Sequence, residues 1–527
     1  MTDISELNYG NWAIAFLPIL LFVLLITTFK IGSSLASLIS FLLAGFIALT
    51  KFGAPLTLLA YGSLKGVSLS FFVLLIIWAS VFLYNLLSEL GAINLIGNYL
   101  ISLSGGTYKK GLLLSWCVSG FIQGITGFGV PVAVVAPLMV AIGLPLMKSV
   151  TAVLVGHAWA VTFGSIGSSY YALYLVTGID ESILSTRLAI MFALPVILTG
   201  YAVAHIIGGW KFVITGSPFI IFIGISMSMC ILLVVKMSIP QMASTLPAIL
   251  GILIGIPLIS FGLNSKTTLR PHDKYNFWHG IYRYRSLLAA FSPYVILISL
   301  SLISRLNFMN GIGEQLSWGF NFPSQITDLG YTVHPAPKFA SVSAITHPGL
   351  LIFISSAITY LIYRYLGLWK NGSLMIAAKS TALQSYKSSI AIALIVMMAM
   401  VMVDSGMVNM LAKGTAYLAG DTFPFFSPFI GGFGTFLTGS NTNSNLLFGS
   451  LQVQSALSLG VIPVTLASAQ SIGASLASAI APAKILVGTT LVGITGKEGE
   501  VLRKAFPYCM LLIISVGIET VIFAFLE

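Results

Sequence analysis

The chain is 527 residues long, 57% hydrophobic and only 7% charged, with a mean hydropathy of +1.00. Such values are typical of a helical protein that crosses a membrane many times, and they exclude a large soluble domain. The net charge of +11 does not indicate nucleic-acid binding, because the basic residues lie in short loops beside apolar segments, as orientation signals do.

Simple transmembrane spans are predicted wherever an apolar run is long enough for one helical crossing, and together with the irregular regions they predict about twelve transmembrane helices. The first span follows Asp3 and Glu6 rather than a basic segment, so we expect it to be retained rather than cleaved as a leader. The simple spans are Trp12 to Phe29, Ile31 to Leu49, Gly66 to Leu87, Leu188 to Ile207, Phe212 to Val235, Met242 to Phe261, Leu287 to Ser304, Pro348 to Tyr365, Ser388 to Leu411 and Ala505 to Leu526.

Two apolar regions are too long for one crossing. The first runs from Gly111 to Ile179 and is interrupted only by Lys148 and His157, whereas the second is interrupted between Thr422 and Gly496 only by Lys484. Both contain clusters of Gly, Pro, Ser, Thr or Asn, which favour turns and helix caps over continued helix. Because lipid tolerates broken backbone only where it lines a polar cavity or is covered by protein, these breaks predict a binding site.

The breaks follow the same order in both regions. A predicted hairpin over residues 111–147 precedes a break at residues 164–169, and a predicted hairpin over residues 422–458 precedes a break at residues 481–484. If the basic loop that contains Lys266, Arg270, Lys274, Arg283 and Arg285 is cytoplasmic, the first hairpin enters from the cytoplasmic side and the second from the external side.

We therefore expect an all-α polytopic membrane protein, an inverted-repeat secondary transporter with two re-entrant hairpins and two broken helices. The repeats are predicted over residues 1–265 and 348–527, with a basic connecting loop, one span and an external loop in residues 266–347. The alternative is that Gly and Pro simply accumulate in membrane helices, where both are frequent.

The hairpin tips are suited to an anion. No Arg lies in the interior of a predicted span, since Arg364 is next to the end of its span and the other arginines flank spans or lie in loops. A carboxylate would therefore be held by half-helix N-termini, hydroxyl groups and side-chain amides. The alternative for the polar side chains is that they bind neighbouring helices. The candidate substrate-binding residues are Thr126, Gly127, Phe128, Gly129, Ser440, Asn441, Thr442, Asn443, Ser444, Asn445 and Lys484.

Four ionisable residues in apolar segments are candidates for charge handling, because such residues are costly in a membrane. Lys484 follows Pro482 at a predicted helix start and is either an anion ligand or a side chain that extends to the headgroups. His157 is a proton-coupling candidate or a hydrogen-bonded structural residue. Asp404 and Glu519 are further proton-coupling candidates, and for Asp404 an interfacial or hairpin-supporting role is the alternative.

Two segments, Thr126 to Ala133 and Phe436 to Gln452, resemble the signature regions of the L-lactate permease family, and Gly496 to Glu500 fits it too. The resemblance implies a plasma-membrane symporter that takes up lactate, glycolate or related 2-hydroxy acids with protons. Ser440-Asn441-Thr442 is also similar to the hairpin-tip motif of the wider ion transporter superfamily, whose dicarboxylate members bind carboxylate and sodium. His157 to Ala160 and Lys484 depart from the residues usual in lactate permeases.

The function expected from these features is import of a small 2-hydroxy monocarboxylate by proton symport, with a sodium-coupled carboxylate symporter or an anion channel as alternatives. No P-loop, metal-ligand spacing or catalytic constellation is recognisable, so we expect no enzyme activity, cofactor or metal site. The expected partners are a small organic anion, a coupling cation (proton or sodium) and the lipid bilayer, with a homodimer left open.

Overall fold

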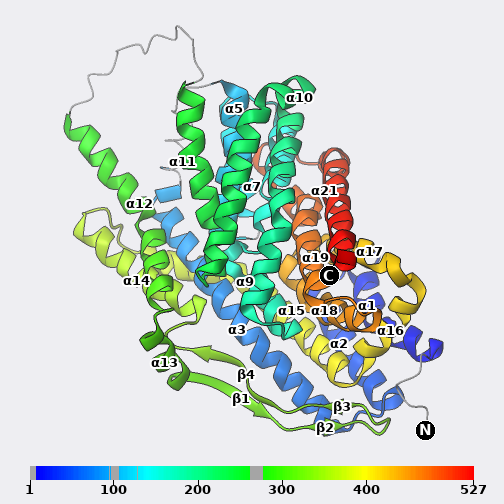
Figure 1. Ribbon diagram of the computed structural model, residues 1–527. Coiled ribbons are helices and arrows are strands. Elements are labelled where there is room, and N and C mark those ends of the chain that lie inside the picture. The colour runs from blue at the N-terminus through cyan, green and yellow to red at the C-terminus, as the bar shows by residue number, and fades with distance from the viewer. Residues whose placement is uncertain (1–7, 94, 96–105, 128, 262–276, 527) are drawn as a thin grey trace.

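The computed structural model describes residues 8–93, 95, 106–127, 129–261 and 277–526, and the chain is mostly helical (Figure 1). Among the described residues, eight helices are long and apolar enough to cross a membrane, or nine if a bent pair counts as one span. This confirms a polytopic helical protein, whereas the predicted number of about twelve transmembrane helices is not confirmed. Phe128 and the basic residues Lys266, Arg270 and Lys274 lie outside the described residues.

One group of helices is built around two long, closely packed helices. α3 (Leu56–Glu89) packs along α15 (Ser373–Asp404), which also contacts α2 (Ser33–Lys51). The same group contains α1 (Tyr9–Thr27), α12 (Phe277–Ile303), α14 (Pro348–Tyr365) and α16 (Met407–Ala419).

Two predicted spans in this group have different limits in the structure. α3 begins at Leu56 rather than Gly66, so Lys65 lies inside the helix. The predicted span from Ser388 to Leu411 was wrong at its end, because α15 ends at Asp404 and Gly406 adopts a left-handed φ of 84° before α16 begins. The buried ion pair between Lys65 and Asp404, at 2.9 Å, accounts for a charged residue inside the apolar helix α3, whereas the left-handed Gly406 accounts for the end of α15.

The first hairpin forms from helices on either side of residues 126–129. Its arms pack against a helix that breaks after Gly156. The elements are α5 (Thr107–Leu112), the π-helical η1 (Leu113–Val118), α6 (Ser119–Ile125), α7 (Val130–Ala141), α8 (Leu146–Gly156), η2 (Ala158–Ala160) and α9 (Gly164–Thr177).

The second hairpin and broken helix repeat this order. α17 (Phe423–Thr438) and α18 (Asn441–Leu459) form the hairpin. α19 (Pro463–Ala477), η5 (Ser478–Ile480) and α20 (Pro482–Leu491) form the broken segment, and η4 (Gly420–Thr422) precedes the hairpin.

A glycine brings each broken helix close to the first arm of its hairpin. A Cβ atom at Gly156 would lie 1.7 Å from the carbonyl oxygen of Ser115 in η1, and one at Gly473 would lie 1.9 Å from that of Pro428 in α17. No side chain fits at either position. The two halves of the chain therefore share a packing device as well as an order of elements.

Longer helices connect and cover these segments. α10 (Glu181–Lys236) breaks at Gly209 (φ 67°, ψ −169°) and folds back on itself, so that Tyr201 and Ser217 are joined by a hydrogen bond of 2.5 Å. The predicted spans Leu188 to Ile207 and Phe212 to Val235 are its two halves. η3 (Pro240–Met242), α11 (Thr245–Phe261) and α21 (Glu498–Leu526) complete this group.

The predicted external loop contains a small amount of regular structure. β1 (Ser317–Phe322) pairs with β4 (Ala336–Ser343), and β2 (Gln325–Ile326) pairs with β3 (Thr332–Val333), both antiparallel. These strands follow α13 (Asn307–Gln315) and lie at one end of the molecule (Figure 1). The protein is thus not purely α-helical, although the strands are confined to this region of the described chain.

Candidate functional site

The two broken segments meet each other inside the molecule. The Ser475 hydroxyl of α19 donates to the carbonyl oxygen of Ala158 in η2 at 2.6 Å, and the backbone N–H of Thr162 donates to the same hydroxyl at 3.2 Å. The Thr162 hydroxyl in turn donates to the carbonyl oxygen of Ser471 at 3.0 Å. Backbone groups freed by one break are therefore satisfied by side chains of the other, as membrane-depth breaks require.

The first break has an unusual backbone. Ser165, Ile166 and Gly167 have φ values of 48°, 51° and 81°, and the helices on either side are bent by 50°. A left-handed conformation is uncommon for any non-glycine residue and especially for a β-branched one such as Ile166. Strain of this kind is found preferentially at functional sites.

The tip of the second hairpin lies against this first break. α17 ends at Gly439, which has a left-handed φ of 72°, and Ser440 caps α18 by accepting the N–H of Asn443 at 3.3 Å. The Asn441 amide donates to the Thr162 hydroxyl at 3.0 Å, and the hydroxyls of Thr442 and Ser169 are 2.8 Å apart. Three predicted residues, Ser440 to Thr442, are thus located where a hairpin and a break meet.

Ser444 and Asn445 have a different environment. The Ser444 hydroxyl donates to the carbonyl oxygen of Gly431 at 2.7 Å and accepts from the Gln470 amide at 3.1 Å. The Asn445 amide donates to the carbonyl oxygen of Ser169 at 3.0 Å and to the Ser471 hydroxyl at 2.9 Å. These contacts are helix-to-helix hydrogen bonds, the alternative that the sequence left open for this polar segment.

The tip of the first hairpin lies on the other side of the same break. A Cβ atom at Gly127 would be 2.6 Å from the Ser165 hydroxyl, and Gly129 (φ 83°) is in van der Waals range of the Lys484 side chain. Thr126 is buried in an extended conformation, and its hydroxyl has no hydrogen-bond partner among the described residues.

These segments enclose a polar cavity of about 260 Å³. Hairpin tips, breaks and the start of α20 contribute to its wall, together with Ser388 and Ile392 of α15. Among the described residues that line it, Lys484 is the single charged side chain. The lining residues are Ser33, Ile77, Gln123, Gly127, Val161, Ser165, Ser168, Ser169, Ser388, Ala391, Ile392, Thr438, Gly439, Ser440, Asn441, Thr442, Asn443, Ala483, Lys484 and Val487.

Lys484 and His157 are adjacent although 327 positions separate them in the chain. The Lys484 ammonium nitrogen lies 3.3 Å from His157 Nε2, and His157 Nδ1 lies 2.7 Å from the carbonyl oxygen of Val153. Lys484 is 6% exposed and His157 is fully buried. Lys484 therefore does not extend to the surface, and its hydrogen-bond partner is an imidazole nitrogen rather than a carboxylate.

The two candidate acids lie away from the cavity lining. Asp404 is bound by Lys65 through both carboxylate oxygens, at 2.9 and 3.2 Å. Glu519 is half-buried on α21, and its Oε2 atom has no hydrogen-bond partner among the described residues. The Nδ1 atom of His205 lies 2.7 Å from the hydroxyl oxygen of Tyr508, so this nitrogen does not bond Glu519.

Several lining residues were not predicted from the sequence. Gln123 and Ser388 carry polar groups in apolar helices, and the only sequence signal was their polarity, whereas Ser168 lies in the predicted break at residues 164–169 but was not singled out. The side-chain amide oxygens of Gln123, Asn441 and Asn443 have no hydrogen-bond partner among the described residues. The cavity thus offers unpaired acceptors as well as donors, so it can bind a ligand that has both a carboxylate and a hydroxyl group.

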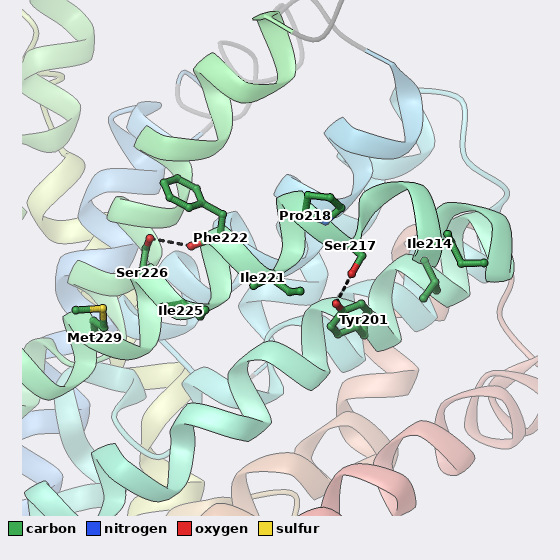
Figure 2. Close-up of a pocket in the computed structure, with 10 residues that line it drawn as sticks. Tyr201, Ile214, Ser217, Pro218, Ile221, Phe222, Ile225, Ser226 and Met229 are labelled. Atoms are coloured by element: carbon green, nitrogen blue, oxygen red, sulfur yellow. Dashed lines mark hydrogen bonds between the residues drawn. The ribbon is translucent and has the colours of Figure 1, made fainter.

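A larger hollow of about 890 Å³ lies between the two halves of α10 (Figure 2). Its wall is mainly apolar, with side chains such as Ile221 and Phe222, and none of the described residues that line it is charged. Tyr201 and Ser217, its main polar groups, already bond each other (Figure 2). The smaller cavity at the breaks is therefore the candidate functional site.

The chain is similar to one family of known proteins along nearly its whole length. The L-lactate permease family matches residues 11–527. The L-lactate permease of Bacillus subtilis is 28% identical over 84% of this chain and 83% of its own length. The glycolate permease GlcA of Escherichia coli is 27% identical over 97% of this chain and 95% of its own.

Among solved structures, the YdaH transporter of Alcanivorax borkumensis aligns with 85% of this chain and 84% of its own, at 12% identity and a TM-score of 0.42. The family match extends through both hairpins, both breaks and the cavity between them. The chain belongs to the L-lactate permease family and is a multi-pass protein of the plasma membrane.

Proposed function

We propose that this protein is a secondary active transporter that imports a small 2-hydroxy monocarboxylate, L-lactate or glycolate, by proton symport. The observation that carries this proposal is a polar cavity lined by both hairpin tips and by Lys484. Relatives named for L-lactate and for glycolate both align over most of the chain. The two acids share a carboxylate with an adjacent hydroxyl group and differ by one methyl group.

The size of the cavity supports a small substrate. Its volume of about 260 Å³ is below the range of roughly 300–1,000 Å³ usual for ligand pockets. A three-carbon hydroxy acid therefore suits it better than a large amphiphile.

The donors of the cavity support a carboxylate. Lys484 supplies an ammonium group, and the start of α18 supplies backbone N–H groups that have no acceptor within the helix. The Ser440 hydroxyl accepts the N–H of Asn443, so the N–H groups of Asn441 and Thr442 remain for an anion. Gly127, at the first hairpin tip, lines the cavity as well.

The acceptors support a substrate hydroxyl group. The side-chain oxygens of Gln123, Asn441 and Asn443 lack partners among the described residues, and a buried acceptor without a donor is costly. A 2-hydroxy acid brings one donor beside its carboxylate. We propose that this donor distinguishes lactate from an acid of equal size without a hydroxyl group.

The same unpaired oxygens favour one alternative, sodium coupling, because hard cations prefer carbonyl oxygen ligands. An anion channel is disfavoured by the buried position of Lys484, which is 6% exposed, since a carrier must enclose its substrate before releasing it on the other side. We further propose that the two hairpins are re-entrant from opposite faces, as inverted repeats require.

The experiment is uptake of radiolabelled L-lactate and glycolate into proteoliposomes under a proton gradient, a sodium gradient or neither. Proton-dependent, saturable accumulation inhibited by unlabelled 2-hydroxy acids is expected, with propionate a weak inhibitor. Sodium-dependent accumulation would favour the alternative cation. Uptake that never exceeds equilibrium under any gradient would overturn symport.

A further inference from the structure

The two departures from the usual family residues, His157 and Lys484, are one structural unit. His157 lies directly after α8, at the point where the first helix breaks. Lys484 lies in the first turn of α20, directly after the break in the second helix. Each residue comes from a different half of the chain, and their side-chain nitrogens are 3.3 Å apart.

The directions of the hydrogen bonds determine which nitrogen of His157 carries a hydrogen and which can accept a proton. The carbonyl oxygen of Val153 can only accept, so His157 Nδ1 carries a hydrogen. In the neutral imidazole Nε2 then has a lone pair, which accepts a hydrogen bond from the Lys484 ammonium. A proton on Nε2 removes that acceptor and leaves two positive charges side by side.

The described part of the chain places no permanent anionic partner beside Lys484 and His157. No described residue that lines the cavity is acidic, and neither of the described acids in ion pairs, Asp404 and Glu181, pairs with Lys484. A buried charge without a counter-ion is strongly unfavourable, so the unit tolerates one positive charge far better than two.

The neighbouring helices carry ionisable groups that bind elsewhere. On α8, Lys148 donates to the carbonyl oxygen of Ile207 at 2.9 Å, and on α10, His205 bonds Tyr508. On α21, Glu498 accepts from Thr489 at 2.8 Å and Cys509 donates to the carbonyl oxygen of Leu476 at 3.5 Å. Glu519 on α21 lines no part of the cavity.

We propose that Lys484 and His157 form a single proton-binding unit, in which Lys484 binds the substrate carboxylate and His157 Nε2 takes the proton that accompanies it. This inference rests on the proposed carboxylate transport. Without substrate the unit carries one positive charge, on Lys484. A carboxylate alone would cancel it and a proton alone would double it, whereas both together leave it unchanged.

Joint binding therefore explains symport by charge balance. The buried site has the same net charge when empty and when fully loaded, so both forms can change conformation at similar cost. The half-loaded forms differ by a full charge in opposite directions. The transported proton titrates the Lys484–His157 pair as a whole. In the loaded site it lies on His157 Nε2, because the Lys484 ammonium binds the carboxylate.

The first test uses the wild-type protein. Calorimetric titration with L-lactate, in buffers of different ionisation enthalpy above neutral pH, should report uptake of about one proton per lactate bound. Lactate binding without proton uptake at every pH would overturn the proposal.

The second test uses His157→Gln in proteoliposomes. The wild type should accumulate L-lactate about tenfold per unit of pH gradient, and His157→Gln should lose this accumulation while exchange of internal for external lactate stays measurable. His205→Gln is the matched control, because His205 bonds Tyr508 rather than Lys484, and it should retain proton-driven accumulation.

The outcomes separate this inference from the proposed function. Full proton-driven accumulation by His157→Gln would overturn the proton-binding unit and leave lactate–proton symport standing. Failure of the wild type to bind any 2-hydroxy acid would overturn the proposed function itself. If His157→Gln does not fold, a calorimetric result of no proton uptake on lactate binding by the wild type would still overturn the inference.

Discussion

Two buried lysines occupy opposite electrostatic situations in this protein. Lys65 in α3 is held by both oxygens of Asp404, whereas Lys484 in α20 contacts the imidazole of His157 and faces a cavity. Their exposed fractions are nearly equal, 5% and 6%. The difference lies in the counter-ion, which the protein supplies to Lys65 permanently. We infer that Lys65 stabilises the helix pair α3–α15 and that Lys484 receives its counter-ion from solution.

The largest effect is expected from breaking the permanent pair. Asp404→Asn leaves the Lys65 ammonium buried without a charge partner and should lower the free energy of unfolding by about 3–5 kcal/mol. Thermal unfolding of the purified protein in detergent measures the loss. The double variant Lys65→Met/Asp404→Leu should recover most of it, and a double variant as unstable as the single one would contradict a purely structural pair.

The second prediction concerns Lys484→Gln, which tests whether the other buried lysine binds substrate. It removes a hydrogen bond to a charged group, worth about 1.5–3 kcal/mol, so KM for L-lactate should rise roughly ten- to hundredfold. Stability should change little, because no carboxylate loses its partner. If the melting temperature falls as it does in Asp404→Asn while KM is unchanged, Lys484 stabilises the fold, as Lys65 does, and does not bind substrate.

Two asparagines of the second hairpin also differ between a substrate-binding and a structural role. Asn441 lines the cavity, whereas Asn445 bonds Ser169 and Ser471 behind it. Asn441→Ala should raise KM up to about tenfold, the worth of one hydrogen bond. Asn445→Ala should mainly lower the melting temperature, and the reverse pattern would show that the substrate is bound deeper than the cavity.

The smallest effect is expected at Glu519. It has an unpartnered carboxylate oxygen within the described residues but lines no part of the cavity. Glu519→Gln keeps its shape, so proton-driven uptake should stay within about twofold of the wild type, as is usual away from a site. Uptake that no longer depends on the proton gradient would move the coupling site from the Lys484–His157 pair to this residue.

The sequence predicts the breaks well because their causes are local. Gly439 and Ser440 favour a turn and a helix cap wherever the chain is placed, and the same is true of Gly406, which was overlooked beside Asp404. Most of the simple spans were predictable from length and hydropathy alone, although those at Leu287 to Ser304 and Pro348 to Tyr365 are not among the eight described helices that are long and apolar enough to cross a membrane.

Contacts between distant segments were not predictable. Lys65 was read as a boundary because its partner is 339 positions away, and the pairing of Lys484 with His157 depends on how two breaks pack together. Gln123, Ser168 and Ser388 line the cavity because of the direction in which each helix faces. A single apolar sequence carries little information about that direction.

The most direct test of the account follows L-lactate uptake and internal pH in the same proteoliposomes, with no other gradient imposed. Inward movement of lactate should acidify the interior in proportion to the lactate taken up, and the Lys484→Gln protein should show both signals strongly reduced at a lactate concentration near the KM of the wild type. Accumulation of lactate with no change in internal pH would contradict proton symport through this cavity.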